Sequence, residues 1–346
     1  MTSAGTSVIA GSGGRAIVQR TTPGQKRVTP NLFGISFGIA GVAEAWATTA
    51  ALFDAPKGIA NTVWVVAALT WAITAIAYLR YVGLRGRLRA DLLDPVFAPF
   101  LAVATIVPML LGAALAADAR PVGVTIFTVG LIATVSLGGW LIGQWIVSDL
   151  TLQQWHPGYF LPTVAGGYLA ATASAGLGYD SLAKLMFGYG TVSWLVLGSI
   201  LLQRLFTQPR LPVPLLPTMA IEVAPPVVAG DALFAINGGH ITAVTLGLAG
   251  YALLMVLVQL RLIPLYRSVP FGPSWWSFSF SYAAVFVDAI AWLSAEHAKQ
   301  GRAWAYVLAV VVSGAVLALV GRTVVALKND AFLPRSPVPA SQPPPN

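Results

Sequence analysis

Three carboxylates interrupt segments of the chain that are otherwise apolar: Glu44, Glu222 and Asp288. An ionised carboxylate at the centre of a bilayer costs about 2.5–3.5 kcal/mol on insertion scales, so such groups normally face a helix-bundle interior or a water-filled cavity. Apolar surroundings also favour the protonated form of a carboxyl. These residues are therefore candidate proton sites. A structural hydrogen bond to a kinked neighbouring helix explains Glu222 equally well.

Other kinds of site chemistry are not indicated. The chain has no cysteine, which excludes disulfides, thiolate metal sites and a thiol nucleophile. Its three histidines, His156, His240 and His297, share no ligand-like spacing. No nucleophile elbow or zinc motif occurs, and Gly238-Gly239 has no phosphate-binding context. We therefore predict neither an enzyme nor a metal or other cofactor site.

The segments that hold the three carboxylates have the composition of membrane helices. Of 346 residues, 57% are hydrophobic and 9% charged, whereas about a quarter of a soluble domain is charged. A β-barrel would need segments of about ten residues with alternating polarity, and these runs are longer and apolar on all sides. We predict an all-α integral membrane protein with ten transmembrane helices. The predicted spans are Asn31–Phe53, Ile59–Tyr81, Val96–Ala117, Pro121–Val147, Phe160–Gly178, Ser181–Leu202, Leu215–Ile236, Ile241–Leu262, Ser274–Ala295 and Ala303–Leu319.

The chain divides into one membrane domain and two tails. Residues 31–328 are predicted to form the ten-helix domain. Residues 1–30 are rich in Gly, Ser and Thr, and residues 329–346 are rich in Pro, so both are expected to be disordered. The first thirty residues lack the apolar core of a signal peptide, and the first hydrophobic segment then serves as the insertion signal.

The basic residues predict the orientation in the membrane. If the amino terminus and every second loop share one side, that side holds 15 of the 20 Lys and Arg residues. Basic residues are retained in the cytoplasm, so we predict a multi-pass protein of the cell membrane with both termini cytoplasmic. The formal net charge of +8 is thereby explained by topology, and no nucleic-acid partner is expected.

Acidic and proline residues both segregate by helix parity. The three carboxylates lie in the first, seventh and ninth predicted spans, and interior prolines lie in the third, fifth and seventh. An interior proline frees a carbonyl and kinks a helix, which membranes tolerate where neighbouring helices or water satisfy the freed group. We predict five helical hairpins whose odd members line a common hydrated path. Chance combined with packing is the alternative, and close helix packing equally explains Gly34, Gly38 and Gly41 on one face of the first span. The kink candidates are Pro99, Pro108, Pro162, Pro217, Pro225 and Pro226.

Four motifs resemble those of the tellurite-resistance/dicarboxylate transporter family, which includes bacterial anion channels and plant guard-cell slow anion channels. They are Phe33-Gly34-Ile35-Ser36-Phe37-Gly38-Ile39-Ala40-Gly41 followed by Ala45-Trp46, Tyr159-Phe160-Leu161-Pro162-Thr163-Val164-Ala165-Gly166, Leu216-Pro217-Thr218 with Ala224-Pro225-Pro226, and Trp275-Trp276-Ser277-Phe278-Ser279-Phe280. All four fall on odd helices, in the order the family has them. The resemblance implies five hairpins with quasi-five-fold symmetry around a central pore, commonly in a homotrimer.

The same resemblance implies a gate. The second phenylalanine of the ninth-helix motif plugs the pore in the family, and it corresponds to Phe280. An aromatic plug in a narrow apolar pore blocks hydrated ions by occlusion and dewetting. Ser281 follows here, where the family usually has proline or a small residue, and Glu44 and Asp288 match no family motif.

Two functions follow from these observations. The first is a gated channel for small inorganic or organic anions, which would be attracted by helix N-termini, by N–H groups near kinks at Gly38 and Gly41 and at the prolines, and by the hydroxyls of Thr163 and Thr218. The second is a secondary carrier of C4-dicarboxylates or oxyanions such as tellurite, coupled to protons through Glu222, Glu44 or Asp288. Flux that follows a pH gradient distinguishes the carrier from the channel.

Overall fold

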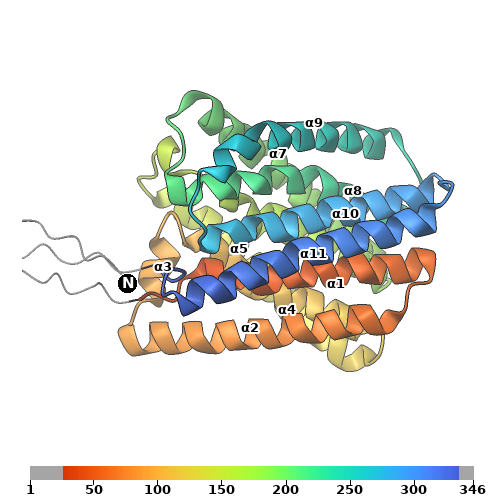
Figure 1. Cartoon of the computed structure of the whole chain (residues 1–346), viewed down its shortest axis with the longest axis horizontal. Coiled ribbons are helices and arrows are strands. Elements are labelled where there is room, and N and C mark those ends of the chain that lie inside the picture. The colour runs from red at the N-terminus through yellow and green to blue at the C-terminus, as the bar shows by residue number, and fades with distance from the viewer. Residues whose placement is uncertain (1–25, 335–346) are drawn as a thin grey trace, which may run out of the picture.

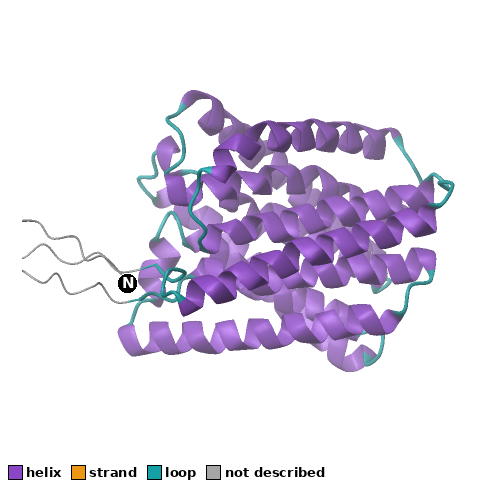
Figure 2. Cartoon of the chain, viewed as in Figure 1, coloured by secondary structure: helices purple, strands orange, loops and turns teal. Residues whose placement is uncertain are grey.

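Residues 26–334 are the part of the chain that the computed structural model describes, and their helices run side by side in one bundle (Figure 1). No β-strand occurs among these residues (Figure 2). The predicted all-α class is therefore confirmed. The predicted disordered tails, residues 1–30 and 329–346, lie outside the described residues except at positions 26–30 and 329–334.

The bundle consists of long α-helices and of short 3₁₀ or π segments. The α-helices are α1 (Gly34–Phe53), α2 (Lys57–Arg85), α3 (Leu88–Leu93), α4 (Leu101–Leu115), α5 (Arg120–Val147), α6 (Gly166–Gly176), α7 (Asp180–Thr207), α8 (Ala224–Asn237), α9 (Ala243–Arg267), α10 (Ser277–Ala295) and α11 (Gly301–Lys328). The 3₁₀ segments are η1 (Pro30–Phe33), η2 (Ala98–Phe100), η3 (Leu152–Gln154), η4 (Pro157–Phe160), η6 (Val213–Val223) and η7 (Pro273–Trp276), and η5 (Leu161–Ala165) is a π-helix.

Nine helical segments within residues 26–334 are long and apolar enough to cross a bilayer. Each overlaps one of the predicted spans. The fifth predicted span, Phe160–Gly178, is built differently, because the π-helix η5 precedes an α6 of only 11 residues. An α-helix needs about 20 residues to cross the hydrocarbon core, so α6 alone is too short and the tenth crossing stays a prediction.

The helices form an inner and an outer set. The segments that contain α1, α4, α8 and α10 bury 61%, 61%, 78% and 44% of their most apolar window inside the protein. The corresponding shares for α2, α5, α7, α9 and α11 are 22%, 33%, 28%, 22% and 22%. The outer helices direct large side chains such as Leu69, Ile73 and Leu195 outward, where lipid tails are the matching solvent. The inner helices are those that the sequence predicts to line a common path.

The inner helices share an irregular start. A 3₁₀ or π segment that contains proline runs directly into each of α1, α4, α6, α8 and α10. Proline has no N–H to donate and fits the first turn of a helix, where that donor is unpaired in any case. Pro225 and Pro226 lie in this position in α8, at its second and third residues. The outer helices α2, α5, α7, α9 and α11 are 25 to 29 residues long.

Contacts between helices follow the order of the chain, and the last inner helix contacts the first. Each inner helix packs against the outer helix that follows it, in the pairs α1–α2, α4–α5, α6–α7, α8–α9 and α10–α11. The inner helices also contact one another in sequence, from α1 to α4, α6, α8 and α10, and α10 packs extensively against α1. The first and last inner helices are thus neighbours.

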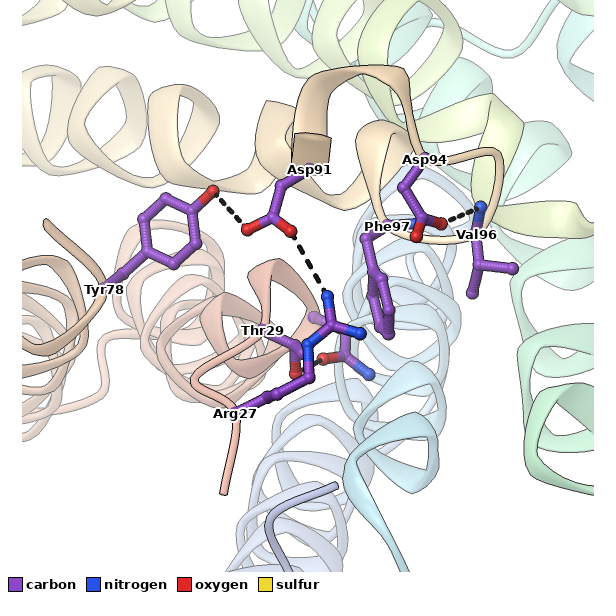
Figure 3. Close-up of polar contacts among 8 residues, drawn as sticks. Arg27, Thr29, Tyr78, Asp91, Asp94, Val96 and Phe97 are labelled. Carbon is purple, nitrogen blue, oxygen red and sulfur yellow. Dashed lines mark hydrogen bonds and ion pairs between the residues drawn. The ribbon is translucent and has the colours of Figure 1, made fainter. Parts of the chain in front are cut away.

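A polar cluster beside α3 holds the first described residues near the bundle (Figure 3) and the last described residues pack on them. The Arg27 guanidinium donates to Asp91 Oδ1 over 3.4 Å, and the Tyr78 hydroxyl donates to Asp91 Oδ2 over 3.0 Å. The Arg27 backbone N–H donates to the Pro334 carbonyl over 2.8 Å, and Lys26 forms an ion pair with Asp330. Burial raises the pKa of the Asp91 carboxyl, while Tyr78 and the charge of Arg27 oppose that shift.

Asp91→Ala should lower the free energy of unfolding by about 2–4 kcal/mol, because Asp91 is 1% exposed and its loss strands the Arg27 charge and the Tyr78 hydroxyl. Thermal unfolding of the purified variant, followed by tryptophan fluorescence, measures the loss. Lys26→Ala is the matched control, since the side chains of the Lys26–Asp330 pair are 51% and 48% exposed and its removal should cost under about 1 kcal/mol. Equal stability of the two variants would contradict a structural role for Asp91.

Candidate functional site

Two cavities lie among the inner helices, and within residues 26–334 Phe280 is the one residue that lines both. The larger has a volume of about 630 Å³. Its wall includes Gly41 of α1, Leu110 of α4, Leu169 of α6, Val228 of α8 and Ala284 of α10, with residues of α2. All five inner helices therefore contribute to it.

The smaller cavity also borders Phe280 and has a volume of about 30 Å³. Its lining comes from the irregular starts of the inner helices and the first turns that follow them. The lining residues are Asn31, Gly34, Phe37, Phe100, Val103, Leu161, Ile221, Pro273, Trp276, Ser277, Phe280 and Ser281. Phe280 itself is 8% exposed and borders both cavities.

Small residues on α1 position the Phe280 ring. A Cβ on Gly41 would lie 3.2 Å from Phe280 Cδ2 and 2.7 Å from the Cβ of Ala283. A Cβ on Gly38 would overlap the Ser279 side chain. The predicted glycine face of α1 is therefore a close contact with α10, and of the candidates Gly38 and Gly41 it is Gly41 that reaches the large cavity.

The large cavity is lined by more acidic than basic residues. Glu44 of α1, Asp231 of α8 and Asp118 after α4 line it, against one basic residue, Lys57 of α2. Small anions in such a cavity are repelled when the carboxyls are ionised. The cavity can hold a hydrated anion at low cost only where these groups are protonated or paired.

Asp231 is a site residue that the sequence analysis missed. It lies inside the seventh predicted span, Leu215–Ile236, five residues after Pro226, and an acidic residue within an apolar span was the signal that could have found it. Asp231 interacts electrostatically with Glu44 and with Asp288. The three side chains come from three different inner helices, α1, α8 and α10.

Asp288 does not line the large cavity. Its side chain is 7% exposed, and Oδ1 accepts no hydrogen bond from the described residues. A Cβ on Gly230 would lie 2.7 Å from this Oδ1, so the glycine allows Asp288 to lie against the α8 backbone next to Asp231. Asp288 also lines a groove of about 510 Å³ between α8, α9, α10 and α11.

Glu222 is separate from this group of acids. It lies in η6, is 7% exposed and lines neither cavity. Its Oε1 has no hydrogen-bond partner among the described residues. The structure thus brings Glu44 and Asp288 near Asp231 and leaves Glu222 elsewhere.

The predicted proline and threonine residues lie behind the cavity walls, since none of them is in the described lining of either cavity. Pro99 is in η2, Pro108 inside α4, Pro162 in the π-helix η5 and Pro217 in η6. The Thr218 hydroxyl donates to the Leu215 carbonyl over 2.7 Å and is thereby satisfied.

Thr163 differs from Thr218 because its buried hydroxyl has no partner among residues 26–334. Its methyl group lies near Gly138 of α5, so the side chain is directed toward the outer layer. A π-turn such as η5 often marks a functional position in a helix. Neither predicted threonine donor faces a cavity.

The small cavity is bordered by an aromatic cluster that includes a buried histidine. Phe100 lines the cavity and stacks on His156, with ring centroids 5.7 Å apart. His156 Nδ1 accepts from the Gly158 N–H over 3.2 Å. Complete burial lowers the pKa of His156 to about 4, so the ring is neutral at pH 7 and adds no positive charge near the small cavity.

Comparison with known proteins gives one family match and two similar relatives. The family model described as SLAC1, voltage-dependent anion channel, matches residues 27–324. The chain is 29% identical over 286 residues to the tellurite resistance protein TehA homolog of Haemophilus influenzae. This alignment covers 82% of this chain and 86% of the relative. It is 27% identical over 157 residues to the guard cell S-type anion channel SLAC1 of Arabidopsis thaliana. This second alignment covers 45% of this chain and 28% of the relative.

Proposed function

Because the chain belongs to the SLAC1 family of voltage-dependent anion channels, we propose that it is a gated channel for small anions in which Phe280 closes the pore. The single observation that carries this proposal is that Phe280 borders two cavities whose described linings have no other residue in common. An apolar ring at a narrow point keeps hydrated ions out by steric occlusion and dewetting.

The proposed pore runs through both cavities and is lined by α1, α4, α6, α8 and α10. The pairing of each inner helix with the next outer helix, and the contact between α1 and α10, support five hairpins in a quasi-five-fold ring. In this arrangement η4, η5 and α6 together provide the tenth crossing. We further propose that residues 31–328 form the membrane domain and that both termini are cytoplasmic in the cell membrane, as the basic loops indicate. The homotrimer remains a prediction from the family resemblance.

The family also supports transport in place of catalysis. The relatives are named for an anion channel and for tellurite resistance. The second candidate function is therefore a secondary carrier of oxyanions or dicarboxylates, and a specific observation favours it: Glu44 and Asp231 line the large cavity, where a proton and an anion could be taken up together.

Reconstitution in liposomes should separate these functions. A channel is expected to pass chloride or nitrate down the gradient of that anion, with a current that reverses at its equilibrium potential whatever pH gradient is imposed. A carrier would give flux that follows the pH gradient and stops when protonophores collapse it. Protein-free liposomes are the control, and pH-driven flux without current would overturn the channel proposal.

A further inference from the structure

A narrow contact between α1 and α10 holds the proposed gate. Gly34, Gly38 and Gly41 lie three and four residues apart on α1 and therefore share one face of the helix. Added Cβ atoms at these positions would meet Trp276, Ser279 and Ala283 of η7 and α10. Small residues let two membrane helices approach closely, so this face is a fixed contact and not a loose one.

Phe37 belongs to this contact and lies flat against the gate residue. The ring centroids of Phe37 and Phe280 are 3.6 Å apart and the ring planes differ by 5°. Carbon atoms in contact are about 3.5–4.0 Å apart, so the two rings lie almost directly over each other. Aromatic pairs left to themselves prefer offset or edge-to-face arrangements with centroids about 4.5–7 Å apart. Packing between α1 and α10 therefore imposes the stack.

The two rings have different positions relative to the cavities. Both line the small cavity, and Phe280 alone of the two reaches the large one. Phe37 is 5% exposed on a packed helix, so it cannot move aside easily. The free space next to Phe280 lies on the other side, in the cavity of about 630 Å³.

We propose that Phe37 is a positioning residue that holds Phe280 across the pore, and that opening requires the Phe280 ring to leave this stack toward the large cavity. The inference rests on the proposed function, since it assigns a partner to the proposed gate. It predicts that the flat aromatic ring of Phe37, and not only the volume of its side chain, sets the fraction of channels that are closed.

The test is single-channel recording of Phe37→Leu in planar bilayers. Leucine keeps an apolar side chain there but removes the flat ring. The ratio of open to closed time should rise about threefold to tenfold, the range that corresponds to losing one aromatic pair. The unitary conductance is recorded as a separate readout, because Phe37 also lines the small cavity. A residue that only lined the pore would change conductance and leave open time unaltered.

Two controls make the result specific. Phe33→Leu makes the same replacement at a residue that is 2% exposed and packs on Tyr78, and its open time should match that of the wild type. In a Phe280→Ala background, adding Phe37→Leu should leave the open time unchanged, since the stack is already lost.

The outcomes separate this inference from the proposed function. If Phe280→Ala conducts and Phe37→Leu keeps wild-type open times, the positioning role of Phe37 is wrong while the gate stands. If Phe280→Ala does not increase current, the gate itself is wrong. An increased open time for Phe37→Leu that persists in the Phe280→Ala background would also overturn the inference, because the effect would not act through Phe280.

Discussion

Phe280→Ala should increase anion flux by at least about tenfold, which requires only ~1.4 kcal/mol less barrier. The alanine methyl leaves the space between the two cavities open, so water and a hydrated anion can pass where the ring excluded them. No other described residue lines both cavities, so none is placed to replace the plug. Currents through planar bilayers and chloride or nitrate efflux from liposomes both measure the change.

A matched control lies two residues earlier in the same motif. Phe278 contacts Tyr266, Trp275 and Tyr282 and lines neither cavity. Phe278→Ala removes the same atoms from the same helix and should leave flux within about twofold of the wild type, a change worth less than ~0.5 kcal/mol. Both variants must give the elution profile of the wild type in detergent. Equal flux from the two alanine variants would show that neither ring closes the path.

The inner and outer helix sets could be predicted because they differ in composition. An outer helix needs only enough apolar residues to cross the bilayer. An inner helix must also accommodate closely packed neighbours and a cavity. That requirement placed proline, glycine and acidic residues on alternate spans of the sequence. The burial of α1, α4, α8 and α10 agrees with this prediction.

Span ends and the fifth span were predicted less well, for two physical reasons. The last helix was expected to end at Leu319 and runs to Lys328, because Arg322 and Lys328 can continue a helix whose charged ends lie outside the hydrocarbon. The fifth span, Phe160–Gly178, contains a π-turn around Pro162. A change of hydrogen-bond register leaves no hydropathy signal, so composition could not reveal it.

The candidate site was predicted in part. Phe280, Gly41 and Glu44 line the large cavity. The predicted prolines and threonines are not in its described lining. Proline and threonine types are informative about helix geometry but do not specify which way a side chain faces. Phe37 lay within a quoted motif and could not be recognised as the partner of Phe280, because nothing in the sequence states that α1 packs on α10.

Neutralising the acids of the large cavity should have the second large effect. A carboxylate about 6 Å from an anion raises its energy by roughly 3 kcal/mol at an effective dielectric constant of 20, and salt in the cavity reduces this value. Glu44→Gln combined with Asp231→Asn removes two such charges and leaves Asp118 and Lys57. In a Phe280→Ala background, where current is measurable, conductance at a pH high enough to ionise both acids should rise about fivefold to tenfold, an effect of ~1–1.4 kcal/mol.

The pH dependence of the same conductance follows from the same charges. Protonation removes the charge of Glu44 and Asp231, so conductance of the Phe280→Ala channel should increase as the pH on the large-cavity side falls. Asp288 interacts electrostatically with Asp231, and Asp118 and Lys57 are the other charged residues in the described wall, so these three groups set how steep the increase is. The conductance of the doubly neutralised variant should depend less on pH. At neutral pH it should already be near the value that the Phe280→Ala channel reaches at low pH. Glu296→Gln, which alters an acid of the outer groove alone, should retain the full dependence.

The sign of this result decides between the two candidate functions. In a channel the acids only repel the anion, so neutralising them raises conductance. In a proton-coupled carrier the same carboxyls would have to bind and release the proton, so Glu44→Gln with Asp231→Asn would abolish flux driven by a pH gradient in the otherwise wild-type chain. For the channel we expect that variant to retain anion flux down the anion gradient, with a higher current than its parent at a pH where the parent acids are ionised. Loss of flux with the Glu296→Gln control intact would assign the large cavity to coupled transport, because no change in a purely repulsive charge lowers the passage of an anion.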